Sequence, residues 1–172
     1  DVGENTDILF IYPPTPTPES FGYAGGRVEP LGIGYLASYA KDHGYKSTLT
    51  NLWNKPVNQI SIENLISEIK PRIVAISSMT ENFDNGTRIA QWIKELDNSI
   101  IIMFGGPHVT YQDIESLQNH NYIDFILRGE GEYTFIDLIN FITIGQPSLD
   151  KIFGITYRAN GKIQQNPDRY YI

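Results

Sequence analysis

Residues 72–108 have the sequence RIVAISSMTENFDNGTRIAQWIKELDNSIIIMFGGPH and contain a complete strand–helix–strand unit. Arg72–Ser78 is a short and nearly continuous apolar run, which is typical of a strand buried on both faces. Asp84–Asp97 follows with its large aliphatic residues on one helical face. Ile100–Phe104 is a second apolar run, ended by two glycines and a proline. The unit predicts two parallel strands joined by a helix that covers their sheet.

The same alternation of apolar runs and helical patterns continues on both sides of this unit. The other strands are expected at Asp7–Tyr12, Lys46–Leu52 and Ile123–Leu127. The other helices are expected at Leu31–His43, from an N-cap at Ser61 to just before Pro71, from a capping pair of Thr110 and Asp113, and at Glu132–Ile142. Five strand–helix units in succession predict an α/β fold. At this length we expect a flavodoxin-like (Rossmann-like) three-layer sandwich with a five-stranded parallel sheet of order 2-1-3-4-5.

The pattern changes after Pro147. Gly154–Arg158 and Lys162–Gln165 flank an Asn-Gly pair, which favours a tight turn, so we expect a small C-terminal β-hairpin. Asn166–Ile172 has no periodicity and is interpreted either as a linker to a further domain or as a frayed terminus. The sequence therefore indicates a flavodoxin-like domain over residues 1–146 and a hairpin with a linker over residues 147–172.

The composition limits the possible functions. Of the 172 residues, 41% are hydrophobic and 19% charged, which is typical of a globular protein. The formal charge of −7 argues against non-specific binding to nucleic acid or to an anionic membrane. No apolar run is long enough to span a bilayer and no signal segment opens the chain, so we expect a soluble, cytoplasmic protein. Because cysteine is absent, this polypeptide cannot supply a disulfide, a thiolate metal ligand or a cysteine nucleophile.

In a parallel α/β sheet, ligands bind at the carboxyl ends of the strands, and the unusual residues of this sequence lie there. Gly105-Gly106-Pro107-His108 follows the fourth strand, where two glycines either admit a ligand close to the backbone or simply form a tight turn. The hydroxyls of Ser77-Ser78-Met79-Thr80, after the third strand, can donate to a ligand or cap the backbone. Glu130, held between Gly129 and Gly131 after the fifth strand, is a candidate for contact with a ligand.

Familiar catalytic and nucleotide motifs are absent from the sequence. It contains no G-x-G-x-x-G after the first strand and no G-x-x-x-x-G-K-[ST]. It also lacks the G-x-S-x-G elbow of an α/β-hydrolase. The first strand ends Ile11-Tyr12-Pro13, without the acidic cluster of a response regulator. These absences argue against hydrolase and phosphotransfer chemistry.

Together the strand-end motifs resemble those of a known family. Ser77-x-Met79 and Gly105-Gly106 resemble the Ser-x-Leu and Gly-Gly elements of cobalamin-binding flavodoxin-like domains. More specifically, the chain is similar to the cobalamin-binding domains that precede radical S-adenosylmethionine enzymes. The segments that carry this likeness are PLGIGYLA (30–37), GGPHVT (105–110), RGEGE (128–132) and GITYR (154–158) with Asn166-Pro167. The resemblance covers nearly the whole chain.

This resemblance implies that the corrin ring lies over the carboxyl edge of the sheet and that its nucleotide tail inserts beside the central strands. The tail would be lined by Ser77, Met79, Gly105 and Gly106, and the ring bordered by the loops containing Glu130 and Gly131 and Tyr23 to Val28. The implied cofactor-binding residues are Tyr12, Pro13, Gly26, Ser77, Ser78, Met79, Thr80, Gly105, Gly106, Pro107, His108, Gly129, Glu130 and Gly131.

The resemblance also implies a parent enzyme, a methyltransferase with methylcobalamin as methyl carrier. Its iron–sulfur cluster and S-adenosylmethionine would be bound by a radical S-adenosylmethionine domain after residue 172, because the cluster requires three cysteines that this chain lacks. That domain and the corrinoid cofactor are the expected partners, with neither nucleic acid nor a membrane among them. This fragment alone would then bind cofactor without catalysing a reaction.

Two features leave alternatives open. The Asp-x-His-x-x-Gly motif that supplies a cobalt ligand in other cobalamin modules is missing between Pro13 and Leu31, and we expect a packing role for His108 in place of cobalt ligation. His43 and His120 are expected to be solvated. The rival functions are a flavodoxin-like interaction or regulatory domain with no cofactor, and an enzyme that uses Glu130 and His108 as acid and base.

Overall fold

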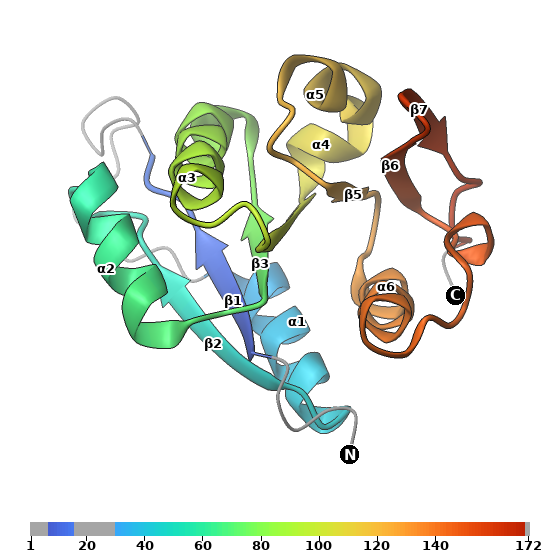
Figure 1. The fold of residues 1–172 in the computed structure, drawn as a ribbon, viewed down its shortest axis with the longest axis horizontal. Coiled ribbons are helices and arrows are strands. Elements are labelled where there is room, and N and C mark those ends of the chain that lie inside the picture. Colours follow the sequence, from blue (N-terminus) through green and yellow to red (C-terminus); the bar gives the residue numbers. More distant parts are fainter. Residues whose placement is uncertain (1–6, 16–29, 171–172) are drawn as a thin grey trace.

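The protein is built on one seven-stranded sheet, and the computed structural model describes residues 7–15 and 30–170 of the chain (Figure 1). The strands are β1 (Asp7–Tyr12), β2 (Lys46–Asn51), β3 (Ile73–Ser77), β4 (Ile101–Gly105), β5 (Phe125–Leu127), β6 (Ile155–Ala159) and β7 (Lys162–Gln165). The helices are α1 (Leu31–Asp42), α2 (Gln59–Ile69), α3 (Phe83–Leu96), α4 (Pro107–Tyr111), α5 (Asp113–Asn119) and α6 (Glu132–Ile144), with short 3₁₀ turns η2 (Thr80–Asn82) and η3 (Leu149–Lys151).

The first five strands are parallel and adjacent in the order β2-β1-β3-β4-β5, which confirms the predicted topology for this part. The prediction of a sheet limited to five parallel strands was wrong. The C-terminal hairpin extends the sheet, because β6 pairs antiparallel with β5 and β7 pairs antiparallel with β6. The physical reason is burial: β5 has a free edge, and Ile155 and Tyr157 of β6 can be buried only by joining it.

The sheet is covered on both faces, so the predicted three layers are present (Figure 1). Helices α1 and α6 pack on one face, through residues such as Ile33 and Phe135. Helices α2 and α3 pack on the other face, where Ile66 and Ile93 are buried, and α4 and α5 add to that layer. The strands are therefore buried on both sides, as their continuous apolar runs predict.

Two helix starts differ from the sequence-based expectation. Helix α2 is capped by Asn58, whose side chain accepts from the Ser61 amide at 2.9 Å, and Ser61 completes the capping box. Helix α4 begins at Pro107, not at Thr110, because proline at the first helical position is already set for helical geometry. The Thr110 hydroxyl instead donates to the carbonyl of Gly106 at 2.9 Å inside that helix.

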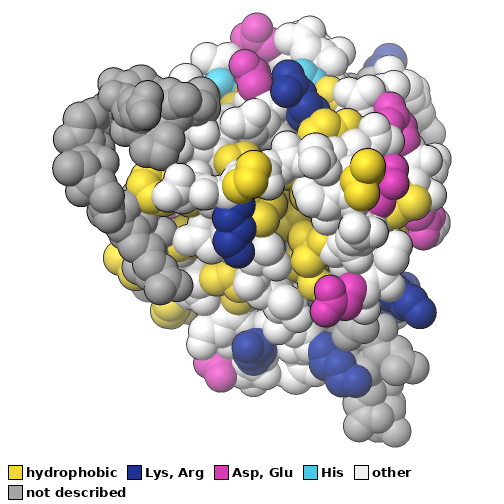
Figure 2. Space-filling view, turned by 90° about the vertical axis from the view of Figure 1, so that its left-hand side faces the viewer, with side chains coloured by type: hydrophobic (Ala, Val, Ile, Leu, Met, Phe, Trp, Pro, Cys, Tyr) yellow, Lys and Arg dark blue, Asp and Glu magenta, His cyan; other side chains and the backbone are white. Residues whose placement is uncertain are grey.

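On the side of the molecule that carries α2, the exposed hydrophobic side chains do not form one continuous surface. They lie in small patches separated by polar and charged groups (Figure 2). Among the described residues, no helix has the length and hydropathy needed to cross a bilayer.

Candidate cofactor site at the carboxyl edge of the sheet

The adjacent strands β3 and β4 carry small residues near their carboxyl ends on one face of the sheet. On the face covered by α1 and α6, Ala75 and Ser77 of β3 lie beside Met103 and Gly105 of β4, with Ser77 directly opposite Gly105. The other face of the same strands carries large residues, among them Phe104, which is fully buried. Since side chains alternate along a strand, this asymmetry leaves space beneath α1 and α6 while the opposite layer is filled.

A cavity of about 400 Å³ occupies this space. Its deep wall consists of buried residues from the middle of the strands and from α6, namely Phe10, Ala75, Met103, Leu127 and Phe135. Its mouth is formed by exposed residues in the loops and helix starts at the carboxyl edge, namely Leu31, Met79, Pro107 and Glu130. The cavity thus reaches from the carboxyl edge to the centre of the sheet, and its size and apolar lining are typical of a site for an organic ligand.

Two helices begin at the cavity. The first residues of α1, Leu31 and Gly32, and the start of α6, Gly131 and Glu132, line it. The first amides of a helix have no partner within it, and in the part of the chain that the structure describes neither helix has a side-chain cap at its N-terminus. No lysine or arginine lines the cavity among the described residues. The backbone amides at these helix ends are therefore the groups available to an anionic part of a ligand.

Gly105 and Gly106 are glycines for different reasons. Among the described atoms, a Cβ atom at Gly105 would find only the Leu127 carbonyl oxygen within 4 Å, at 3.9 Å, so the described fold leaves room for a side chain there. Gly106 has a φ of +105°, and a Cβ atom would lie 2.5 Å from the carbonyl oxygen of Ser78. Gly106 is thus required by the turn, whereas the missing side chain of Gly105 keeps the cavity open.

A buried asparagine joins two loops at the cavity mouth. The side chain of Asn82 accepts from the amide of Met79 at 2.8 Å and donates to the carbonyl of Pro13 at 3.3 Å. Asn82 is completely buried. Asn82 therefore holds the loops after β1 and β3 at a fixed separation.

The neighbouring Tyr12 phenol lines the cavity. Burial, together with the charge of Glu81, raises the pKa of this phenol, so it remains neutral.

The structure brings most of the predicted site residues together. Those that line the cavity are Tyr12, Ser77, Met79, Gly105, Gly106, Pro107, Gly129, Glu130 and Gly131. Those that do not are Pro13, Ser78, Thr80 and His108. Ser78 is completely buried, and its hydroxyl has no hydrogen-bond partner in the described part of the chain. Gly26 and the segment from Tyr23 to Val28 lie outside the described residues.

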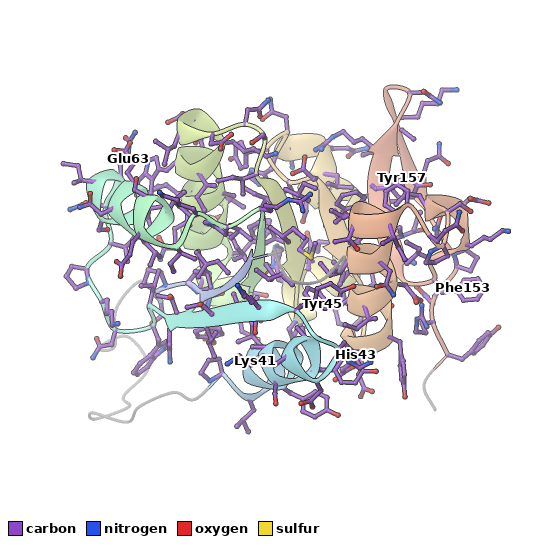
Figure 3. The ribbon with its side chains drawn as sticks, turned by 60° about the horizontal axis from the view of Figure 1, so that its bottom comes forward. Lys41, His43, Tyr45, Glu63, Phe153 and Tyr157 are labelled. Atoms are coloured by element: carbon purple, nitrogen blue, oxygen red, sulfur yellow. The ribbon has the colours of Figure 1, made fainter. Side chains whose placement is uncertain are left out.

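No histidine of the described residues lines the cavity. His108 stacks on Phe83, with ring centroids 4.1 Å apart, and its Nδ1 lies 3.3 Å from the Thr80 hydroxyl. His43 is exposed at the end of α1, next to Tyr45 (Figure 3). The expectation that His120 is solvated was wrong. It is partly buried edge-on against Phe83, because the loop after α5 folds back onto α3.

The sequence did not identify the cavity residues that lie inside strands and helices, away from the loops. Ala75, Met103 and Phe135 sit in ordinary apolar runs, and only their register across the sheet makes them neighbours. Asn82 had no motif to mark it. The sequence did contain one indication of the cavity, which was the small side chain of Ala75 in a strand with large aliphatic neighbours. Ala75 lies opposite Phe10 on one adjacent strand and Met103 on the other.

These features define a class of protein, an α/β domain with an apolar cofactor-sized cavity at the carboxyl edge of a parallel sheet. The B12 binding domain family matches residues 21–139, which is more than half of the chain, so the chain belongs to that family. This confirms the resemblance to cobalamin-binding domains that the strand-end motifs indicated.

Similar proteins are longer enzymes. An uncharacterized methyltransferase of Pyrococcus horikoshii is 30% identical over 94% of this chain and 35% of its own length. An anaerobic magnesium-protoporphyrin IX monomethyl ester cyclase of Rubrivivax gelatinosus is 29% identical over 93% of this chain and 29% of its own. The cobalamin-dependent radical SAM methyltransferase TokK of Streptomyces tokunonensis is 25% identical over 80% of this chain and 20% of its own. The chain thus spans about a third or less of these relatives.

Solved structures show the same fold. The cobalamin-dependent S-adenosylmethionine radical enzyme OxsB, with aqua-cobalamin and S-adenosylmethionine bound, superposes with a TM-score of 0.79 at 22% identity. The match covers 98% of this chain and 23% of that one. The radical S-adenosylmethionine methyltransferase TsrM from Kitasatospora setae, solved with cobalamin and a [4Fe-4S] cluster, has a TM-score of 0.77 at 15% identity, over 95% of this chain and 29% of its own.

Proposed function

We propose that this chain binds cobalamin in the cavity beneath α1 and α6, as the cobalamin-binding part of a larger radical S-adenosylmethionine enzyme. The observation that carries the proposal is the hollow formed by Ala75, Ser77 and Gly105 on one face of the central strands. An unused hollow in the middle of a sheet would cost packing energy, because protein interiors are normally filled. Membership of the B12 binding domain family supports cobalamin as the occupant.

The residues present fit the tail of this cofactor. The apolar wall of Phe10, Met103 and Phe135 suits a flat aromatic base, and Gly105 leaves the space that the base would take. The uncapped starts of α1 and α6 offer backbone amides to a phosphate, which compensates for the absence of a basic side chain from the described cavity wall. The Ser77 hydroxyl is placed to donate to the tail.

The cavity mouth fits the ring. Leu31, Met79 and Pro107 offer an exposed apolar rim, on which a large flat macrocycle can rest. His108 stacks on Phe83 and does not line the cavity, which supports a packing role for it and gives no support to an acid–base pair with Glu130. When bound, cobalamin supplies a cobalt centre that can carry a methyl group, and the chain's own residues position it and exclude water from its tail.

The parent reaction that we propose is methyl transfer, since a relative from Pyrococcus horikoshii and one from Streptomyces tokunonensis are named as methyltransferases. The cyclase named in Rubrivivax gelatinosus favours ring formation as a second candidate. The cavity has the same role in both, so the binding proposal does not depend on which of them holds. The iron–sulfur cluster and S-adenosylmethionine belong to another domain in either case, because this chain contains no cysteine.

Titration with hydroxocobalamin tests the binding proposal. The chain is expected to change the visible spectrum of the corrinoid and to elute with it. Gly105→Leu should abolish co-elution while the protein stays folded, because the new side chain enters the cavity and meets no wall close to its Cβ atom. Gly34→Ala is the matched control, since Gly34 lies in α1 outside the cavity, and a Cβ atom there would touch only Leu49 at 4.0 Å. Absence of binding by the unmodified chain would overturn the proposal.

A further inference from the structure

The C-terminal segment Asn166–Arg169, called the strap below, is bound along the side of the fold. The Asn166 side chain donates to the carbonyls of Leu149 and Ile152, at 2.7 and 2.8 Å. The carbonyl of Pro167 accepts from the amide of Gly154 at 2.8 Å. Residues that the sequence pattern left as a linker or a frayed end are therefore fixed by individual hydrogen bonds.

Arg128 connects the strap to the interior. Its guanidinium group donates to Asp168 at 2.8 and 3.0 Å, and also to the carbonyl of Asn166. The same group donates to the carbonyl of Ile155 at 2.9 Å and lies 3.5 Å from the carboxylate of Asp113. Both Arg128 and Asp113 are buried, so this ion pair is shielded from solvent while the strap's Asp168 is exposed.

Arg128 immediately precedes the cavity. Gly129, Glu130 and Gly131 follow it in the chain and form one side of the cavity wall. The amide of Arg128 donates to the carbonyl of Gly154 at 2.8 Å, so its backbone is held as firmly as its side chain. Because the guanidinium group and the backbone are both fixed, Arg128 helps to set the direction in which the Gly129–Gly131 loop leaves β5, together with the Thr110 hydroxyl, which accepts from the Gly129 amide at 3.1 Å.

The strap is also bonded to α6, whose first turn lines the cavity. The side chain of Arg169 donates to the Thr134 hydroxyl at 3.0 Å and forms an ion pair with Asp137, both in α6. The first turn of α6 carries Glu132 and Phe135, which line the cavity. The strap thus holds the loop before α6 and the helix itself.

From this arrangement we propose that Arg128 is a positioning residue for the cofactor, through which the strap sets the affinity of the cavity for cobalamin. The inference rests on the proposed function. It assigns no contact between Arg128 and the ligand: Arg128 acts by fixing the Gly129–Gly131 loop against the cavity. By linkage, cobalamin that binds the ordered loop must in turn stabilise the strap.

The chain offers a matched control in Arg158. Its guanidinium group also holds backbone carbonyls, those of Ile123 at 2.6 Å and His120 at 2.7 Å together with that of Leu117. Because β6 runs antiparallel to β5, Arg158 lies toward the edge of the sheet opposite the cavity. Replacing either arginine removes a part-buried guanidinium network, whereas only Arg128 adjoins the cavity wall.

The test compares Arg128→Met with Arg158→Met in hydroxocobalamin titrations and urea unfolding. Both variants are expected to lose stability. Arg128→Met should weaken cobalamin binding about tenfold or more, and Arg158→Met should change it less than twofold. If the wild-type chain binds and the two variants bind equally well, the positioning role is overturned. If the wild-type chain itself does not bind, it is the proposed function that fails.

Two further measurements keep the test decisive if Arg128→Met does not fold. Asp168→Ala removes the exposed arm of the network and leaves the buried pair with Asp113 intact, and it should weaken binding severalfold. In hydrogen exchange of the wild-type chain, hydroxocobalamin should slow the exchange of the Arg128, Gly154 and Asn166 amides. Unchanged affinity in Asp168→Ala, or unchanged exchange at these amides in the bound chain, would overturn the inference.

Discussion

Gly106 lies directly against the backbone of Ser78, so that a Cβ atom at Gly106 would be 2.5 Å from the carbonyl oxygen of Ser78 and 3.0 Å from its nitrogen. The turn after β4 is thus pressed onto the end of β3. Gly105, its neighbour in the sequence, has no comparable contact. Gly106 is therefore required by the fold, whereas the missing side chain of Gly105 leaves space for a ligand.

Alanine substitutions at these positions should destabilise the fold to different extents. Gly106→Ala is expected to lower the free energy of unfolding by about 2–4 kcal/mol, because it adds backbone strain at φ +105° to a backbone overlap. Gly105→Ala should cost less than about 1 kcal/mol, since its Cβ atom enters open space. Urea unfolding of the chain without cofactor, followed by circular dichroism, measures both values. Equal losses would contradict this assignment of roles.

Ser78, at the same turn, tests whether a buried hydroxyl outside the cavity contributes to stability or to cobalamin binding. Among the described residues its buried hydroxyl has no hydrogen-bond partner, and such a group costs about 1–3 kcal/mol relative to a solvated one. Ser78→Ala should therefore leave stability unchanged or raise it by up to about 1 kcal/mol. Cobalamin affinity should also stay unchanged, because Ser78 does not line the cavity. A clear loss of affinity in this variant would show that the hydroxyl serves the ligand after all.

The strand order could be predicted because it depends on local patterns. Each parallel strand is a short apolar run and each connection is a helix, so few topologies remain. The place of the hairpin could not be predicted in this way. Its residues Ile155 and Tyr157 alternate as in any half-buried strand, and only the free edge of β5 determines where they are buried.

Some residues of the candidate site could likewise be predicted from the sequence, and others could not. Ser77, Gly105 and Glu130 were identified because strand ends can be located in the sequence and the carboxyl edge is where such folds bind ligands. Arg128 was noted only as part of the RGEGE segment, and Asn82 was not singled out, because their roles depend on bonds to residues that are distant in the sequence, such as Asp168 and Pro13. Single long-range hydrogen bonds of this kind leave no periodic pattern.

Asn82 should contribute strongly to stability. Asn82→Ala leaves the amide of Met79 and the buried carbonyl of Pro13 without this partner, and we expect a loss of about 2–4 kcal/mol. Asn85→Ala is the control, because Asn85 is only partly buried and, within the described ranges, its side chain donates to the carbonyl of Pro14 at 2.7 Å and makes no second bond. It should cost about 1 kcal/mol. Chemical denaturation of the two variants distinguishes these values, and similar losses would mean that Asn82 is not a special link between the loops.

The histidine cluster around Phe83 predicts a dependence of stability on pH. Burial lowers the pKa of His108 below its usual 6.5, against the opposing charges of Asp84 and Glu115. Burial likewise lowers the pKa of His120, where the charge of Asp84 opposes the shift and the charge of His108 adds to it. In the unfolded chain both imidazoles take up protons near pH 6.5, while in the folded chain they do so only at lower pH. The unfolded state therefore binds more protons in this range, and the free energy of unfolding must fall as the pH falls.

The range from pH 7.5 to 5.5 isolates this effect, because ordinary carboxyl groups titrate below it. Urea unfolding at several pH values should show a decrease in stability that begins as the pH approaches 6.5 from above. The double variant His108→Gln/His120→Gln should lose much of this dependence, because glutamine does not titrate. A double variant with the same slope as the wild-type chain would place the titrating groups elsewhere and refute the role assigned to the cluster. A slope of opposite sign in the wild-type chain would mean that protonation is favoured in the folded state, contrary to the burial of both rings against Phe83.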